Sequence, residues 1–430
     1  MDADTTSFIC PVMCALFTSL LLALLIMPPI MRLCRRTGAM DRPGGHKAQR
    51  RPVPCLGGLG VFAAAIAGLC IAAGTSLLGA DARILGIAAG GAGCVILGII
   101  DDRTPVSAVA KLAFLLAAGL VAASCGVRAH IFDGAWGAYA DIGIAMLWIA
   151  GVASAFNSID NTDGAAAGTA SIAAAGFCAA ALLVPGASAP AHIIACACAL
   201  LGACLGFLAY NWPEARIYLG DNGSLFIGFT LASLVLCARW SPDPLRSAAV
   251  PAALMTAPLL DLGLSTLLRC RRGAVATIRE AIVYCGHDHL AHRFQAFGMS
   301  PARSSAALWG IGGVSAAAAV ALGAAPTEPF FLLILAGHAL FVAAASAILA
   351  RAPIGGICRP AAGRGPAHAY AGRPIAELGN VLPSRLSLLT EPPDASRAAA
   401  ASPGLRSTAA NHGAAAAPPP RAAAGRVLPG

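Results

Sequence analysis

Carboxylates and amides gather in one short stretch of a chain that otherwise carries little charge. Residues 156–168 read FNSIDNTDGAAAG and place Asn157, Asp160 and Asp163 between two long apolar runs. Ionisable side chains beside apolar helices are costly and usually serve a function. Asp163 is also suited to cap the following helix, but capping explains one of these residues and leaves the others. We therefore interpret the stretch as part of a catalytic or binding site.

An acidic pair forms a second candidate site. Asp101 and Asp102 are adjacent, and Lys111 follows ten residues after the first of them. Neighbouring carboxylates repel each other and ordinarily need a cation, a metal or a shared proton nearby. A solvated helix end explains the pair alone equally well. The chain has two lysines, Lys47 and Lys111. Lys111 favours a functional site here, because it supplies a compact ammonium group.

A third motif lies in residues 211–224, NWPEARIYLGDNGS. Small residues at a helix start leave backbone N–H groups free for a phosphate, and Asp221 beside them suits a metal that carries the phosphate. A tight turn capped by Asp221 is the alternative.

A histidine motif, GHDHLAHRF, lies in a polar loop over residues 269–303. His289 and His292 are three residues apart and are expected to share a helix face. No third soft ligand accompanies them, so we expect contacts of these histidines and Arg293 with phosphate or sugar in preference to a metal pair.

Composition places these motifs in a membrane protein. Of 430 residues, 58% are hydrophobic and 11% are charged, whereas about a quarter of residues are charged in soluble domains. We expect an all-α, polytopic integral membrane protein with about eleven transmembrane helices, because apolar runs near twenty residues long recur along the chain. The expected helices cover about residues 8–33, 56–78, 84–100, 106–125, 142–156, 165–184, 192–210, 248–268, 304–322 and 330–350, and a further helix runs from the GDNGS motif to about residue 239.

Charges at the ends of these runs predict the orientation. Aspartates precede the first run and arginines follow it, which is typical of an uncleaved anchor with its N-terminus outside. With about eleven helices, every polar motif then falls on the cytoplasmic side. The opposite side of the membrane is expected to carry few charged residues beyond Arg83, Arg128, Arg239 and Arg246.

Other protein classes are disfavoured. The net charge of +9 fits membrane topology better than nucleic-acid binding, because no basic stretch is interleaved with aromatics. The fifteen cysteines form no CxxC pair and mostly lie inside apolar runs, so we expect neither a disulfide framework nor a zinc site. Residues 351–430 are rich in Ala, Pro, Gly, Ser and Arg and are expected to be a disordered tail behind a catalytic domain of residues 1–350.

Five motifs taken in order resemble a known enzyme family. They are DRPGGHKAQRRPVPCLGG at residues 41–58, the acidic pair with Lys111, NSIDNTDG, GDNGS and DHLAHR. They are similar to the polyprenyl-phosphate N-acetylhexosamine-1-phosphate transferases, a glycosyltransferase family 4 type, and in particular to the bacterial undecaprenyl-phosphate GlcNAc-1-phosphate transferase branch. The likeness runs from about residue 41 to the last expected helix.

The resemblance implies a specific reaction. An enzyme of this kind moves a sugar 1-phosphate, most simply GlcNAc-1-phosphate, from a UDP-sugar to undecaprenyl phosphate and releases UMP. It requires Mg²⁺, or Mn²⁺ in its place, and starts a surface polysaccharide pathway at the inner (plasma) membrane. Membrane lipid and these two substrates are the expected partners, nucleic acid is not, and the choice between monomer and homodimer stays open.

The resemblance also implies roles for residues of the acidic motifs. Asp221 and Asn157 would hold the metal against the pyrophosphate. Asp101 and Asp102 match the acidic pair beside the reacting phosphate, where Asp101 would prepare the lipid phosphate for attack. Asp160 matches another acidic position, whose role stays open.

The remaining assignments concern substrate binding. Lys111 and Arg293 would neutralise phosphates, and Asp163 would face the uracil. Lys47 matches the basic first loop. His289 and His292 match the histidine motif.

The chain departs from the family pattern at a few places. His46 and Gln49 stand where Arg and His are usual, which puts any role for these two residues in doubt. Asn161, Ala165 and Ala291 replace a common Gly, Leu and His. None of these changes removes an acidic residue of the motifs, so activity is still expected.

Two alternatives stay open. A phospho-MurNAc-pentapeptide transferase belongs to the same superfamily, although the histidine motif and the RPVP loop favour the GlcNAc type. A transporter would place charged groups at the membrane midplane, but most carboxylates here fall at the ends of expected helices. Asp261 is the main exception.

Overall fold

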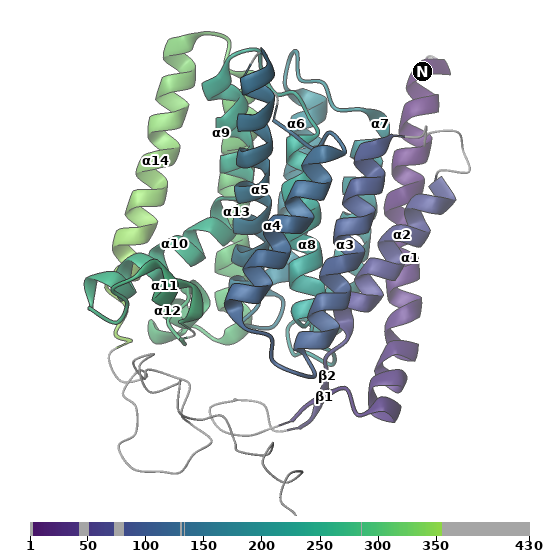
Figure 1. Ribbon diagram of the computed structural model, residues 1–430, viewed down its shortest axis with the longest axis vertical. Coiled ribbons are helices and arrows are strands. Elements are labelled where there is room, and N and C mark those ends of the chain that lie inside the picture. The colour runs from purple at the N-terminus through teal and green to yellow at the C-terminus, as the bar shows by residue number, and fades with distance from the viewer. Residues whose placement is uncertain are drawn as a thin grey trace, which may run out of the picture. The chain divides into compact units, whose positions relative to one another are not determined.

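The computed structural model describes residues 3–42, 51–72, 81–129, 131–132, 134–284 and 286–354. These residues are almost entirely helical (Figure 1). The helices are α1 (Ala3–Thr37), α2 (Gly57–Ala72), α3 (Ala82–Asp101), α4 (Ala108–Ser124), α5 (Gly134–Ile159), α6 (Ala165–Leu183), α7 (Ala191–Asn211), α8 (Asp221–Leu236), α9 (Pro244–Leu254), α10 (Thr256–Arg271), α11 (Ile278–Val283), α12 (Leu290–Ala296), α13 (Pro301–Ala324) and α14 (Glu328–Ala350). The all-α prediction is confirmed.

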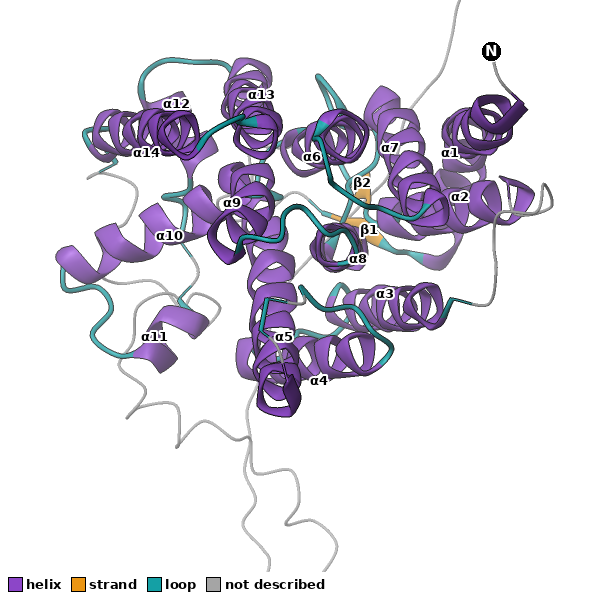
Figure 2. Ribbon diagram, turned by 90° about the horizontal axis from the view of Figure 1, so that it is seen from above, coloured by secondary structure: helices purple, strands orange, loops and turns teal. Residues whose placement is uncertain are grey.

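Helix α8 lies at the centre of the bundle. Every residue from Asn222 to Leu236 is buried, and the helix contacts α3, α5, α2, α6 and α7. Figure 2, which looks along most of the helices, shows α8 enclosed by these neighbours. A helix that is apolar all round is stable only inside such a shell, so α8 positions its first residue, Asp221, within the bundle.

Each expected transmembrane run coincides with a helix, except for one. By length and composition, seven helices of the described residues are able to cross a membrane, or eight if α9 and α10 form one span, while α2, α4 and α8 are shorter apolar helices. The chain is therefore a multi-pass membrane protein. The number of eleven crossings and the outside position of the N-terminus remain predictions.

The prediction of one continuous helix over residues 248–268 is wrong. The structure has two helices there, α9 and α10, that meet at an angle of 81°. Helix α9 ends at Leu254, and Pro251 and Pro258 lie on either side of the break. Proline lacks the N–H that a continuous helix needs and clashes with the preceding turn, so this bend has a cause in the sequence.

Two short strands flank the first loop. β1 (Met40–Asp41) pairs antiparallel with β2 (Val53–Pro54), and Met40 lies opposite Pro54. These strands anchor both ends of the basic segment, of which residues 43–50, with His46, Lys47 and Gln49, lie outside the described residues. The predicted tail also lies outside them from residue 355 onward, so the division at residue 350 stays a prediction.

Close helix approaches bring two chain segments, the end of α3 and the start of α2, to the start of α8. A Cβ on Gly98 of α3 would lie 2.1 Å from the backbone nitrogen of Asn222, and a Cβ on Gly58 of α2 would lie 2.1 Å from Cα of Gly223. Only glycine fits at contacts this short. The ends of α3 and α2 therefore meet the N-terminus of α8, where the acidic motifs converge.

Candidate active site

The acidic motifs meet on one ammonium group. The Lys111 Nζ donates to Oδ2 of Asp101 and to Oδ2 of Asp221, each at 2.9 Å. Asp101 ends α3, Lys111 lies in the first turns of α4, and Asp221 begins α8. Three helix ends thus bring together residues that are far apart in the chain.

Asp102 lies against the start of α8. Its carboxylate accepts hydrogen bonds from the Asn222 side chain at 2.7 Å and from the Asp221 backbone N–H at 3.3 Å. The N–H groups of Gly223 and Ser224 donate to the Gly220 carbonyl oxygen. The expectation of free N–H groups for a phosphate is therefore wrong, since Asp102 and Gly220 already accept them. A negative side chain at this helix end is favoured by the helix dipole.

Asn157 and Asp160 approach the same point from the end of α5. The Asn157 Nδ2 lies 3.4 Å from Oδ2 of Asp221, and its Oδ1 accepts from the Ser224 hydroxyl at 2.8 Å. Asp160 follows α5 and has no hydrogen-bond partner within the described parts of the chain. Burial and the negative charges of Asp221, Asp102 and Asp163 raise the pKa of Asp160 well above its ordinary value. We call Asp101, Asp102, Asp160 and Asp221 the acidic centre.

The loop after Asp160 is held at several points. Oδ2 of Asp163 accepts from the Ala215 N–H at 2.9 Å, and the Asn211 side chain accepts from the Gly164 N–H at 2.7 Å. Burial raises the pKa of Asp163. On the other side, the indole of Trp309 donates to the Gly164 carbonyl oxygen at 3.1 Å. The NSIDNTDG motif is therefore fixed between α7 and α13, beside the acidic centre.

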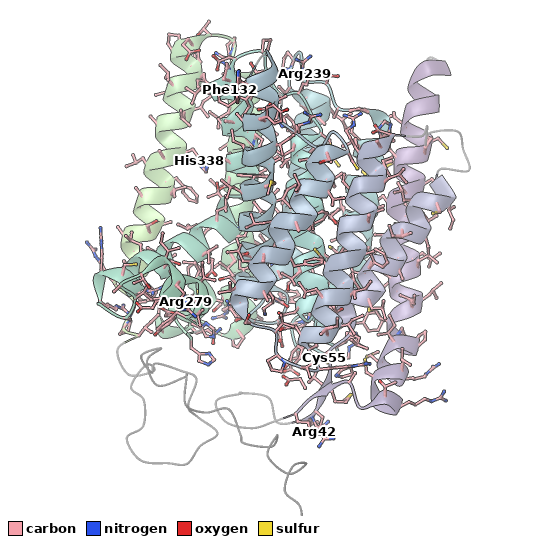
Figure 3. The ribbon with its side chains drawn as sticks, viewed as in Figure 1. Arg42, Cys55, Phe132, Arg239, Arg279 and His338 are labelled. Carbon is pink, nitrogen blue, oxygen red and sulfur yellow. The ribbon has the colours of Figure 1, made fainter. Side chains whose placement is uncertain are left out.

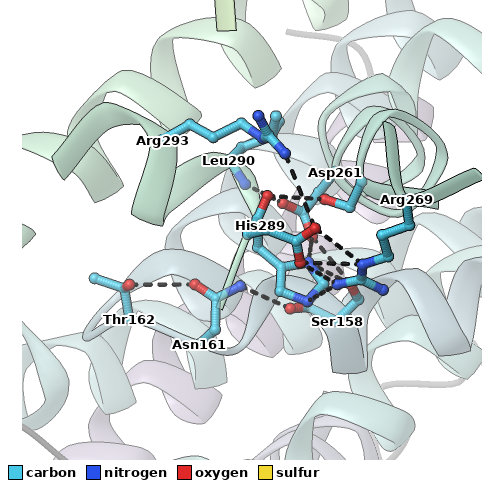
Figure 4. A network of polar contacts seen from close by, with 10 residues as sticks. Ser158, Asn161, Thr162, Asp261, Arg269, His289, Leu290 and Arg293 are labelled. Carbon is cyan, nitrogen blue, oxygen red and sulfur yellow. Dashed lines mark hydrogen bonds and ion pairs between the residues drawn. The ribbon is translucent and has the colours of Figure 1, made fainter. Parts of the chain in front are cut away.

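The histidine motif forms a separate polar network (Figure 4). Asp261 of α10 is fully buried. It accepts from the Leu290 N–H at 2.6 Å, lies 2.8 Å from Nδ1 of His289, and accepts from the Ser158 hydroxyl at 3.0 Å. The Arg269 guanidinium lies 3.2 Å from Nε2 of His289. Because Arg269 only donates, Nε2 accepts and Nδ1 carries the proton that faces Asp261.

An ion pair completes this network. The Arg269 Nε lies 3.0 Å from both carboxylate oxygens of Asp288. Burial raises the pKa of Asp288, but the Arg269 hydrogen bond and charge outweigh it, so the pKa of Asp288 is lowered. We call Ser158, Asp261, Arg269, Asp288 and His289 the histidine network. Adjacent residues on α5, Asn157 and Ser158, join it to the acidic centre.

His292 and Arg293 are turned into the protein. Burial, together with the charges of His289 and His287, lowers the pKa of His292 to about 4, so its ring is neutral at pH 7. Arg293 has no exposed surface and donates to the Leu349 carbonyl oxygen at 3.3 Å. The structure thus places both residues in the packing around α12, and their substrate contacts stay predictions.

The acidic centre has the chemistry of a divalent-cation site. Two of its four carboxylates, Asp101 and Asp221, share the ammonium group of Lys111, and hard oxygen donors of this kind suit Mg²⁺. Across the described ranges, no three His, Cys, Asp or Glu side chains converge closely enough to hold a metal as they stand. Donor type and charge fit the metal, and Asp221 with Asn157 are the residues that would hold it.

Sequence reasoning missed several members of these groups. Asn222 holds Asp102, and Asp261 lies at the middle of the histidine network. Asp261 carried a signal, because a carboxylate inside an apolar helix is costly. Asn222 lies inside the GDNGS motif and Arg269 begins the 269–303 loop, but neither motif indicated that Asn222 holds Asp102 or that Arg269 pairs with Asp288.

The segment that carries the acidic centre is similar to a known protein family. The family described as "Glycosyl transferase family 4" matches residues 84–239. This segment is therefore similar to glycosyl transferase family 4. The resemblance inferred from the motifs is thereby confirmed. The matched segment contains the whole acidic centre and Lys111, whereas Asp261 and His289 lie beyond it.

Relatives carry related names. A probable undecaprenyl-phosphate N-acetylglucosaminyl 1-phosphate transferase of Bacillus subtilis is 29% identical over 72% of this chain and 84% of its own length. A decaprenyl-phosphate N-acetylglucosaminephosphotransferase of Mycobacterium tuberculosis is 29% identical over 61% of this chain and 73% of its own length. A phospho-N-acetylmuramoyl-pentapeptide-transferase of Chlamydia pneumoniae is 44% identical over a shorter stretch, 23% of this chain and 28% of its own length. The chain is therefore similar to membrane transferases of phosphosugars.

Proposed function

We propose that the chain transfers N-acetylhexosamine 1-phosphate, with GlcNAc-1-phosphate as the first candidate, from a UDP-sugar to undecaprenyl phosphate. The products are a lipid-pyrophosphate-linked sugar and UMP. One observation carries the proposal: carboxylates from α3 and α8 meet on the Lys111 ammonium at a common end of the bundle. The names of the Bacillus and Mycobacterium relatives support the choice of substrates.

The reaction forms one bond and breaks one bond. An oxygen of the lipid phosphate attacks the β-phosphorus of the UDP-sugar, and the bond from that phosphorus to the bridging oxygen breaks as UMP leaves. Both substrates are anions, so their approach must be stabilised by fixed positive charge and by positioning. The Lys111 ammonium, held between Asp101 and Asp221, is placed to supply such charge.

Mg²⁺ bound by Asp221 and Asn157 would neutralise the pyrophosphate and polarise its oxygens. Asp101 then orients the lipid phosphate through the Lys111 ammonium that they share. Asp102 keeps the N-terminus of α8 in place, and Asp163 would face the uracil. Under this assignment His289, His292 and Arg293 shape the neighbouring wall. Lys47 of the first loop, which lies outside the described residues, would add positive charge for the anionic substrates.

The proposed site faces the cytoplasm, where nucleotide sugars are made, and the protein resides in the inner (plasma) membrane. Cysteine labelling from either side tests this orientation. An added cysteine at Arg103, beside the acidic centre, should react only when the cytoplasmic side is open to the reagent. Labelling from the outside would contradict the proposed topology.

The reaction is tested by UMP release from purified membranes. We expect UMP to form from UDP-GlcNAc only when undecaprenyl phosphate and Mg²⁺ are present, and to disappear in Asp101→Asn and Asp221→Asn. Substrate uptake into vesicles without UMP formation would favour a transporter instead. The carboxylates of the acidic centre lie at helix ends, which does not suit midplane transport.

A second function, phospho-MurNAc-pentapeptide transfer, is supported by the 44% identity to the Chlamydia protein over a short stretch. The chemistry at phosphorus is the same, and only the donor sugar differs. UDP-GlcNAc and UDP-MurNAc-pentapeptide assayed side by side decide between them. Turnover of the pentapeptide donor alone would replace our first candidate.

A further inference from the structure

The three helices that carry Asp101, Lys111 and Asp221 also carry an arginine-lined cavity at their other ends. This cavity of about 270 Å³ is lined by the start of α3, the segment after α4 and the end of α8. We call the side chains of Arg83, Arg128 and Arg239 around it the arginine pocket. Helix α8 spans 16 residues, which separates the pocket from Asp221 by about 24 Å. Figure 3 shows Arg239 and Cys55 at opposite ends of the bundle.

The charges in this pocket are not balanced. Arg83 pairs with Asp81, its Nε lying 3.0 Å from both carboxylate oxygens, and Asp81 also contacts His192 at 2.6 Å. Among the described residues, neither Arg128 nor Arg239 has a carboxylate partner. No carboxylate occurs among the described side chains that line the cavity. Two guanidinium charges in the cavity are therefore not compensated by any carboxylate of the described residues.

Arg128 is the decisive side chain. Its Nε is shielded from solvent and donates to no protein atom within the described residues. A buried donor without an acceptor is costly, so a ligand whose oxygen accepts a hydrogen bond from Nε would be favoured. Gly126, with φ of +97°, turns the chain after α4 so that Arg128 reaches the cavity.

A helix-dipole role does not account for this arrangement. Arginines near the ends of α4 and α8 would favour the helix C-termini through exposed contacts. Arg83 does make one such contact, with the Cys237 carbonyl oxygen at 3.4 Å. Stabilising a helix C-terminus in this way requires neither the cavity nor an Arg128 Nε that is shielded from solvent.

We propose that the arginine pocket binds a phosphate oxyanion, either a lipid head group or a free phosphate ester. Guanidinium groups match phosphate oxygens through paired N–H donors. Three elements supply one arginine each, so the anion would also tie α3, α4 and α8 together at this end. This site is separate from the proposed transfer reaction, and its test does not depend on that reaction.

The test uses the full chain and two kinds of phosphate. In one arm, purified protein in neutral detergent is titrated with inorganic phosphate, and binding is followed by isothermal calorimetry. In the other arm, protein in nanodiscs of phosphatidylcholine with phosphatidylglycerol is released into the gas phase, and retained lipids are counted by native mass spectrometry. Binding in the first arm indicates a free phosphate, and binding in the second arm alone indicates a lipid head group.

The variants are Arg128→Gln, Arg239→Gln and the pair together. We expect each single change to weaken the binding about tenfold, since a charge-assisted hydrogen bond is lost. Arg246→Gln is the matched control, because Arg246 lies at the same end but bonds Glu328 and the Ala325 carbonyl oxygen. It should bind as the unmodified protein does.

Arg239 is exposed, so Arg239→Gln keeps the test valid if the other variants fold poorly. Absence of binding in the unmodified protein in both arms would overturn the proposal. Equal binding by the unmodified protein and Arg239→Gln would overturn it as well.

Discussion

The acidic centre and the histidine network are neighbours that satisfy their charges in opposite ways. In the network, Asp261 accepts hydrogen bonds from a backbone amide and a hydroxyl and faces a histidine, while Asp288 has a guanidinium partner. In the acidic centre, two of the four carboxylates share the Lys111 ammonium group, Asp102 accepts from Asn222, and Asp160 has no hydrogen-bond partner among the described residues. Paired groups hold a fold together, whereas an excess of one charge is suited to recruit a cation and its anionic substrates.

The largest expected difference is in activity. Asp221→Asn removes a charge from the acidic centre and is expected to lower the rate of UMP release about 100-fold to 1000-fold, in the range seen when a charge-stabilising group is lost. The melting temperature should stay the same or rise, because repulsion among the carboxylates falls. An Asp221→Asn protein with full activity would count against the metal assignment.

The matching change in the histidine network should act on stability. Asp261→Ala leaves the His289 ring N–H and the Leu290 N–H without their buried acceptor, and each buried donor left unsatisfied costs about 1 to 3 kcal/mol. We expect a lower unfolding midpoint in a detergent titration, with the activity per folded molecule falling less than in Asp221→Asn. Unchanged stability of Asp261→Ala would remove the contrast between the two regions.

The sequence identified the acidic centre better than the histidine network. Asp101, Lys111, Asn157 and Asp221 were predicted as one site, and the structure brings them together. Their motifs are local, and carboxylates between apolar runs are conspicuous. Arg269 and Asn222 escaped prediction because their roles follow from partners brought together only by helix packing.

The same distinction holds for the fold. Apolar runs predicted where helices lie, since burial in a membrane depends on composition over about twenty residues. They did not predict the 81° break between α9 and α10. Pro251 was a local signal for that break, but a membrane helix accommodates many prolines, so the bend depends on the packing around it.

A pH titration tests the charge excess of the acidic centre. Because the folded-state pKa of Asp160 is raised, the folded protein binds its proton more tightly than the unfolded chain does. Stability contributed by this group is present at low pH and lost as pH rises from the ordinary value of 3.8 through the raised value. With a chelator present to remove metal ions, the free energy of unfolding of the unmodified protein should fall over this pH window. The fall is about 1.4 kcal/mol for each tenfold difference in proton affinity between the folded and unfolded states. It should be smaller in Asp160→Asn. Identical pH profiles for the two proteins would argue against an uncompensated Asp160.

The smallest expected effects come from adjacent residues on α5. Ser158→Ala removes one hydrogen bond to Asp261 and should lower the free energy of unfolding by about 1 kcal/mol with little change in turnover. Asn157→Ala should instead lower turnover, because Asn157 faces Asp221 and Ser224. Thermal melting and UMP release measured on both variants check this. If both substitutions lowered only stability, or both lowered only turnover, the adjacent residues Asn157 and Ser158 would not belong to separate regions, the acidic centre and the histidine network.

The central claim is that the acidic centre, and not the histidine network, seats a divalent cation. Mn²⁺ binding followed by electron paramagnetic resonance on the purified full chain tests it without any substrate. We predict one bound Mn²⁺ that Mg²⁺ displaces, lost in Asp221→Asn and retained in His289→Gln. Mn²⁺ binding that survives Asp221→Asn but disappears in His289→Gln would contradict the account.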